Sequence, residues 1–237
     1  MMKTADMIAR LNAAYEDVKA GTGGYVAMTA MQEVREALME KLREESAKSA
    51  GILGKVKILN RICCEEKRLT GAWTGSDGCQ YMGNAFMLFK FYAAIPGIVE
   101  RTDPLNGIEK LENLFGLDES CYVEIDADEI DLPKLKACIK TAKAENKHRN
   151  TAIRIGNQYF NAAYIADMLT VMQGDGCRIY QYAADSVSYP KLYVMNEKGE
   201  AVIMPLRIAN EQEMENSVMW TLVYELDVLT AKTEKLA

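Results

Sequence analysis

The chain has 237 residues, of which 49% are hydrophobic and 26% are charged, and its formal net charge is −6. This length and balance predict a folded protein with one large domain or two ordinary ones, and they exclude a largely disordered chain. The acidic net charge argues against a protein that binds nucleic acid over its whole surface, although it is compatible with a local basic patch.

The sequence carries no pattern typical of a membrane span or a secretory signal. Its most apolar charge-free run, residues 79–89, is interrupted by Gln80, Gly83 and Asn84. The N-terminus lacks a basic region followed by an apolar core. The six cysteines are widely spread and include no CxxC pair, as is typical of reduced thiols. We therefore expect a soluble, cytoplasmic protein without a membrane partner.

Residues 1–50 predict an N-terminal helical segment. A first helix is predicted over residues 4–20, where apolar residues recur at helical spacing: Ile8, Leu11, Tyr15 and Val18. Thr29 and Gln32 have capping-box spacing and predict the start of a second amphipathic helix. These two helices either form a surface for a partner or pack on the rest of the protein.

Residues 51–120 predict a short helix followed by a β-hairpin. The helix is expected over residues 55–66. An apolar stretch around Trp73 and a second strand over residues 79–92 are expected to pair, because Asp77-Gly78 supplies a turn. The poorly patterned connection that follows Ile95-Pro96-Gly97 and runs to Ser120 is interpreted as an interdomain link.

Residues 121–210 alternate strand and helix patterns. The predicted elements follow one another in this order: strand 121–125, helix 132–146, strand 151–159, helix 162–173, strand 177–182, and a hairpin that pairs 191–195 with 201–208. Asn161 is the predicted N-cap of the second helix. Residues 211–237 predict a C-terminal helix over 211–236, since acidic residues concentrate in its first turns. Together these elements predict an α+β fold with antiparallel sheet, flanked by N- and C-terminal helices.

Several short motifs follow one another in residues 121–208. Their residues are Phe160, Asn161, Tyr164, Ile165, Asp167, Leu169, Arg178, Ile179, Ser188, Pro190, Met204, Pro205, Leu206 and Arg207. In this order they resemble one domain of the bacterial DNA sliding clamp of the DNA polymerase III β-subunit type. In that family a helix is introduced by Phe-Asn and continues as Tyr-Leu-x-Asp-x-Leu, and the domain closes with Met-Pro-Met-Arg.

The resemblance implies a clamp-like βαβα unit that ends in a β-hairpin, with residues 51–120 as a degenerate second copy. The chain departs from the family because it is shorter than a three-domain clamp, adds N-terminal helices and continues past Arg207. Small clamp-related proteins of phages and mobile elements are the nearest analogy for such a trimmed chain.

The function that the resemblance implies is non-catalytic: a sliding-clamp-like accessory of DNA replication or repair that supports polymerase processivity. Its expected partners are duplex DNA and a polymerase or clamp-loader peptide. Two clamp domains per chain would let three chains form a homotrimeric ring. The alternative is a clamp-fold interaction or scaffold protein that does not encircle DNA.

A strip of basic residues runs along the predicted helix 132–146 and just past its end. It consists of Lys134, Lys136, Lys140, Lys143, Lys147 and Arg149, against the single acid Glu145. The apolar residues Leu135, Cys138, Ile139 and Ala142 are expected to face a sheet, which leaves the lysines on another face. The clamp resemblance implies that this face lies toward DNA phosphates, whereas the alternative is an ordinary solvated face.

The closing motif, Met204, Pro205, Leu206 and Arg207, resembles the floor of the pocket in which clamps accept apolar peptides. A methionine-containing patch at a strand end suits several partners. The alternative is that Val202, Met204 and Leu206 are the inward residues of an edge hairpin.

Catalytic signals are weak in this sequence. The single histidine, His148, lies between Lys147 and Arg149 without a carboxylate nearby in sequence to orient it. Adjacent Cys63-Cys64 would chelate one ion awkwardly, and no second ligand pair follows. The glycine-rich residues 21–24 follow a helix and lack the Lys-Ser/Thr of a phosphate loop. We therefore expect no enzyme activity, no cofactor and no metal.

Overall fold

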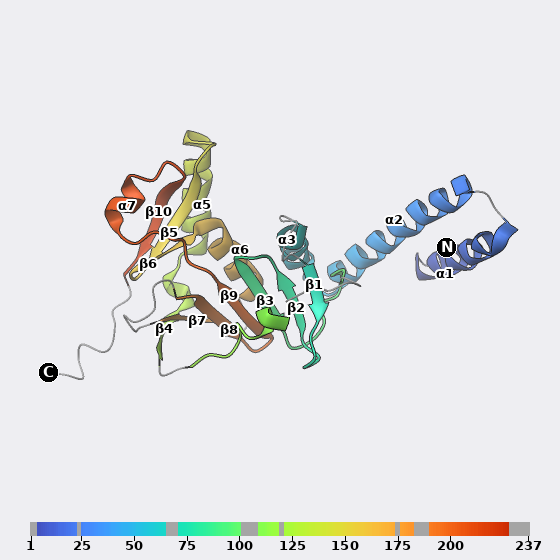
Figure 1. Cartoon of the computed structure of the whole chain (residues 1–237), viewed down its shortest axis with the longest axis horizontal. Helices are drawn as coiled ribbons and strands as arrows, with labels where there is room; N and C mark the ends of the chain where they lie inside the picture. Colours follow the sequence, from blue (N-terminus) through green and yellow to red (C-terminus); the bar gives the residue numbers. More distant parts are fainter. Residues whose placement is uncertain are drawn as a thin grey trace. The chain divides into compact units, whose positions relative to one another are not determined.

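The computed structural model divides the chain into two compact units (Figure 1). One unit comprises Met1–Lys57 and Ile95–Val99, and the other comprises Ile58–Ala94 and Glu100–Ala237. The structure describes residues 4–22, 25–64, 71–100, 109–118, 121–173, 176–182 and 190–227. Helices and predominantly antiparallel strands both contribute, so the predicted α+β class is confirmed.

The smaller unit is built on two helices, α1 (Thr4–Asp17) and α2 (Tyr25–Ser49), joined through a π-helical turn at Val18–Thr22. The helices pack against each other, and the Thr4 hydroxyl donates to the Glu45 carboxylate at 3.4 Å. Both helices were predicted, but α2 begins four residues before the expected cap. Thr29 lies inside α2 and its hydroxyl donates back to the Tyr25 carbonyl oxygen at 3.1 Å, so it caps nothing.

The larger unit contains a seven-stranded sheet in the order β1-β2-β3-β9-β8-β7-β4. All neighbouring strands in it are antiparallel. The strands are β1 (Gly71–Thr74), β2 (Gln80–Gly83), β3 (Met87–Phe91), β4 (Tyr122–Asp126), β7 (Arg178–Tyr182), β8 (Leu192–Asn196) and β9 (Gly199–Ile203). Helix α3 (Leu53–Cys64) precedes β1, as predicted.

A second sheet has three strands in the order β10-β5-β6. Its members are β5 (Asn150–Ile155), β6 (Gln158–Asn161) and β10 (Trp220–Leu226). Strand β6 returns antiparallel to β5, whereas β10 runs parallel to β5.

Helices α5 (Leu132–Glu145) and α6 (Ala162–Met172) pack against each other, and α6 contacts strands of both sheets. The predicted cap is confirmed, because the Asn161 side chain accepts the backbone N–H of Ala163 at 3.0 Å. At the other end of α6, the Asn196 amide donates to the Met172 carbonyl oxygen at 2.7 Å. With both ends of the helix satisfied, α6 is fixed between the sheets.

Two stretches predicted as single strands are hairpins in the structure. In residues 79–92, Asn84 makes a turn because its side-chain oxygen accepts the backbone N–H groups of Phe86 and Met87, both at 2.9 Å. In residues 151–159, Gly156 adopts a φ of 55° in the left-handed region and lets β6 fold back on β5. Both apolar runs concealed their turns because each turn is very short.

The predicted C-terminal helix over 211–236 is wrong. Helix α7 (Glu211–Glu215) is one short turn capped by Asn210, and β10 follows it. The run Trp220-Thr221-Leu222-Val223-Tyr224 is rich in aromatic and β-branched residues, which favour a strand once an edge such as β5 is available. Residues 228–237 lie outside the described part of the chain.

Strands from the 51–120 segment extend the sheet of the 121–208 segment. Strand β3 pairs with β9 over five residue pairs, from Met87 with Ile203 to Phe91 with Gly199. The hairpin β8–β9 is therefore interior, and its interpretation as an edge hairpin is wrong. Helix α4 (Glu109–Glu112) begins the next described segment, residues 109–118.

We predict that Gly83→Ala lowers the free energy of unfolding by about 2 kcal/mol or more. A Cβ at position 83 would fall on the Met87 carbonyl oxygen and lie 2.8 Å from the Leu88 Cα, so the backbone of β3 would have to move. Gly54→Ala in α3 is the control, since open space surrounds that position. It should cost nothing and gain up to about 1 kcal/mol. Urea unfolding measures both, and equal effects would contradict the prediction.

Candidate nucleic-acid interface

Helix α5 presents the predicted lysines to solvent because its apolar side holds it in the fold. Leu132, Leu135 and Ile139 are buried, while Cys138 and Ala142 are half-buried, as the periodicity predicted. The helix packs on α6, β5 and β10. The Asp131 side chain caps it by accepting the backbone N–H of Lys134 at 2.9 Å.

Four of the predicted basic residues form what we call the lysine row. Its members are Lys136, Lys140, Lys143 and Lys147, all of them exposed. Within the described part of the chain, none of the four makes an ion pair with a carboxylate. The lysine row therefore offers positive charge without direct ion pairs on one side of an acidic protein, although Asp126 and Asp128 line a pocket together with Lys136.

The other two basic residues of the strip have different surroundings. The Lys134 ammonium lies 5.6 Å from the centre of the Tyr224 ring of β10, a cation–π distance. The Tyr224 hydroxyl also accepts the backbone N–H of Asp131 at 3.2 Å. Arg149 is half-buried after the end of α5. Neither residue is as available to a ligand as the lysine row.

The four residues expected to line a peptide pocket lie in different surroundings in the structure. The backbone N–H of Leu206 donates to the Tyr159 carbonyl oxygen at 2.7 Å, and its half-buried side chain packs against a cluster of Ala152, Tyr159, Ile208 and Met214. Two members of this cluster, Ile208 and Met214 of α7, follow the closing motif, and no long helix is needed to place them there. Pro205 is half-buried and Arg207 is exposed.

Met204 belongs to a different environment, which we call the aromatic patch: Phe86, Tyr164 and Met204. The Met204 backbone N–H donates to the Phe86 carbonyl oxygen at 2.8 Å. The Phe86 ring is stacked on Tyr164 with centroids 6.4 Å apart, and Phe86 remains 47% exposed. Sequence reasoning missed Phe86, because only the pairing of β3 with β9 brings the Asn84 turn to Met204.

Helix α6 carries no counterpart of the lysine row. The Asp167 carboxylate, one turn after Tyr164, forms an ion pair with the Arg61 guanidinium of α3 at 2.7 Å. Only 16% of the Asp167 side chain is exposed. A polyanion that approaches this helical layer would therefore meet cations on α5 and a paired carboxylate on α6.

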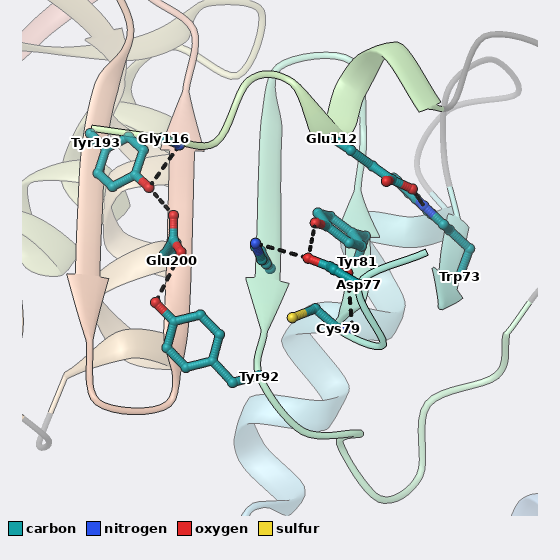
Figure 2. Close-up of polar contacts among 10 residues, drawn as sticks. Trp73, Asp77, Cys79, Tyr81, Tyr92, Glu112, Gly116, Tyr193 and Glu200 are labelled. Atoms are coloured by element: carbon teal, nitrogen blue, oxygen red, sulfur yellow. Dashed lines mark hydrogen bonds and ion pairs between the residues drawn. The ribbon is translucent and has the colours of Figure 1, made fainter. Parts of the chain in front are cut away.

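A cluster of titratable side chains lies on the seven-stranded sheet (Figure 2). The Asp77 carboxylate accepts from the Lys90 ammonium at 3.0 Å and from the Tyr81 hydroxyl at 2.8 Å. Lys90 holds the pKa of Asp77 well below its usual range. Burial lowers the pKa of Lys90, but its hydrogen bonds to Asp77 and Tyr81 outweigh this and raise it.

The pKa values of the neighbouring tyrosine and cysteine side chains are shifted upward, away from neutral pH. Burial and the hydrogen bond to Asp77 raise the pKa of Tyr81 to about 12, and burial raises that of the Cys79 thiol. Burial and Glu200 raise the pKa of Tyr92 to about 12. None of these shifts poises an acid, base or thiolate for proton transfer at neutral pH. The cluster is suited to hold the sheet together.

The residues weighed for catalysis remain apart. His148 is exposed in the turn after α5, where its backbone N–H donates to the Asn146 side-chain oxygen at 3.3 Å, and no contact of its imidazole ring with another described side chain is found. Cys63 donates to the Gly71 carbonyl oxygen at 3.3 Å, while the Cys64 side chain and residues 23–24 lie outside the described part. Among described residues, no three His, Cys, Asp or Glu side chains come together as metal ligands would.

A surface pocket of about 740 Å³ lies beside the lysine row. Its lining includes Asp126, Asp128, Lys136, Thr170 and Cys177. The two carboxylates offset the single ammonium, so the pocket does not add to the basic surface.

None of the described helices combines the length and apolar character needed to cross a bilayer.

Comparisons with protein-family models, with curated protein sequences and with solved structures found no match for this chain. Of the residues that carry the clamp resemblance, Ser188 lies outside the described part, whereas the others fall on β6, α6, β7 and the residues flanking β8 and β9. The resemblance therefore remains a prediction based on these motifs.

We predict that Asp77→Asn lowers the urea midpoint at pH 7 and that this difference narrows as the pH falls below about 4. A carboxyl group whose pKa is lowered on folding stabilises the fold above its unfolded pKa of about 3.9, and loses this effect as it protonates in acid. Asp128→Asn, at an exposed position without an ion pair in the described structure, is the matched control. A constant difference from pH 7 to pH 2 would contradict the assigned role of Asp77.

Proposed function

We propose that this protein is a non-catalytic, clamp-like accessory of DNA replication or repair that contacts duplex DNA through α5. The observation that carries the proposal is the lysine row, in which three exposed lysines on one side of α5 and Lys147 just after its end make no ion pair with a described carboxylate. From Lys136 to Lys143 the row extends roughly 10 Å along the axis of α5. Such a row suits contact with several backbone phosphates and carries no base-specific information.

The order of the clamp-like motifs supports the same proposal. Asn161 caps α6, α6 leads into β7, and the closing Met204–Arg207 motif follows β9. Helix α6 contacts strands of both sheets, and α5 packs on α6 and on the three-stranded sheet. The resemblance to polymerase III β-subunit clamps implies that such a helical layer presents one side to DNA. A phage or mobile element remains our proposed setting for a clamp of this size.

The aromatic patch favours a second candidate function, a clamp-fold protein that binds a protein partner and does not encircle DNA. The exposed Phe86 stacks on the half-buried Tyr164 beside Met204, and these three residues come from segments far apart in sequence. Aromatic and methionine side chains are typical anchors for partner segments. A polymerase or clamp-loader peptide is the partner that the closing motif implies.

We predict that Lys136→Glu/Lys140→Glu/Lys143→Glu strongly weakens the binding of labelled duplex DNA and its dependence on salt. Each lost phosphate contact removes about one unit from the slope of log affinity against log salt, so the slope should fall by up to about three. Fluorescence anisotropy measures the affinity for DNA at several salt concentrations between about 50 and 200 mM, where phosphate contacts weaken measurably, and so gives the slope.

The matched control is Lys41→Glu/Lys48→Glu/Lys57→Glu. These lysines are exposed on α2 and α3, and their reversal changes the formal net charge by the same amount. The control should bind DNA more weakly only through the general change in charge, and keep most of its slope. If the unsubstituted protein fails to bind, or both triple variants bind alike, the lysine row is not a DNA site and the second candidate function is favoured.

The ring is a separate prediction, tested by absolute mass in solution. Three chains of 26.5 kDa would give a stable trimer across a range of protein concentrations in light scattering after size exclusion. A monomer would contradict the ring, while leaving DNA contact through the lysine row to be decided by anisotropy.

A further inference from the structure

A strap crosses one face of the seven-stranded sheet. It consists of residues 109–118, that is α4 and the irregular chain after it. In Figure 2 it passes from above Trp73 of β1 to Tyr193 of β8, over the intervening strands. The strap joins neither sheet, since its described backbone hydrogen bonds are local, such as those from Leu114 to Leu111 and from Phe115 to Glu112.

Two side chains of the sheet and Lys191, which precedes β8, hold the strap. The Trp73 indole N–H donates to the Glu112 carboxylate at 3.2 Å. The Lys191 ammonium donates to the Leu114 carbonyl oxygen, and the Gly116 backbone N–H donates to the Tyr193 hydroxyl at 3.3 Å. Each contact is a single hydrogen bond, so no cooperative ladder has to break for the strap to lift.

Apolar contact supplies the rest of the attachment. Leu111, Leu114, Phe115 and Leu117 are half-buried against a cluster of sheet residues. That cluster consists of Trp73, Tyr81, Leu88, Tyr180, Tyr193 and Val202. The Phe115 ring meets the Tyr81 ring edge-on, with centroids 5.5 Å apart. The strap thus places a Leu-x-x-Leu-Phe-x-Leu pattern on an aromatic face.

The sheet keeps its polar groups satisfied without the strap. The Tyr81 hydroxyl donates to Asp77, and the Tyr193 hydroxyl donates to Glu200. Lifting the strap would leave these pairs in place and return the Trp73 indole and the Lys191 ammonium to water. The cost of opening is therefore mostly exposed apolar surface, and buried polar groups are not left without partners.

We propose that the strap is a built-in ligand of this face, and that the face binds a partner protein's short apolar segment with the same Leu-x-x-Leu-Phe spacing when the strap lifts. The strap itself shows which chemistry the face accepts. The charges on this face favour an apolar protein segment over a nucleic acid. Lys90 is already paired with Asp77, and the carboxylate of Glu200 lies on the same face. This interaction surface is independent of DNA binding by the lysine row.

The test uses a fluorescent peptide of residues 109–118 and the full-length protein. In the variant Leu114→Ala/Phe115→Ala, the weakened strap competes less for its own face, so the peptide should bind at least about tenfold more tightly than to the unsubstituted protein. A peptide with the same two alanines should not bind. Leu222→Ala/Leu226→Ala, which removes half-buried leucines from β10, should bind the peptide like the unsubstituted protein.

Failure of the peptide to bind a strap variant that keeps the far-ultraviolet circular dichroism of the unsubstituted protein would overturn the proposal. So would formation of a dimer by that variant in light scattering, since a second copy would then be the occupant.

Hydrogen exchange in the unsubstituted protein gives a test that does not depend on the variant's folding. The amides of Leu114 and Phe115 should exchange at least about 100-fold faster than those of Phe89 and Val202 in the sheet. Exchange of the strap only at the rate of the slowest sheet amides would mean that it opens with global unfolding, and would overturn the proposal.

Discussion

The larger unit depends on the pairing of β3 with β9. These strands are separated by more than a hundred residues in sequence, and five residue pairs join them in an antiparallel ladder. Without this ladder, the β1–β2–β3 strands would have no sheet to extend, and β9 would present an unpaired edge. The same pairing brings Phe86 to Met204 and places Trp73 on the face that the strap crosses. Two candidate binding surfaces therefore follow from one long-range contact.

Helices α5 and α6 share one layer but differ in what they offer to a ligand. The outer side of α5 is a row of ammonium groups in water, whereas α6 has Tyr164 stacked on Phe86 and Asp167 paired with Arg61. Long-range attraction for a polyanion therefore comes from α5, because a paired charge contributes little field at a distance. This asymmetry favours a one-sided contact with DNA phosphates over a contact shared equally by both helices.

Local signals in the sequence were sufficient for most helices and for the lysine row. Helix α6 has a strong N-cap in Asn161, and α5 has an apolar side with 3.6-residue periodicity, so both can be read without tertiary information. The turns at Asn84 and Gly156 were missed because an apolar run hides a short turn. Strand β10 was taken for a helix because its strand character depends on β5, a partner that lies distant in sequence. The aromatic patch and the strap face were inaccessible for the same reason.

The segment after Arg207, which departs most from the clamp pattern, also supports the basic helix. The half-buried Leu206 packs against the cluster that contains Ile208 and Met214, and β10 then runs beside β5 and places Tyr224 at the start of α5. The Tyr224 hydroxyl satisfies a backbone N–H at the first turn, and its ring receives Lys134. One segment therefore packs beside Leu206 and also contacts the first turn of the helix that carries the lysine row. Under the proposed function, this segment would narrow the space for a peptide at Leu206 while it supports the contacts made by α5.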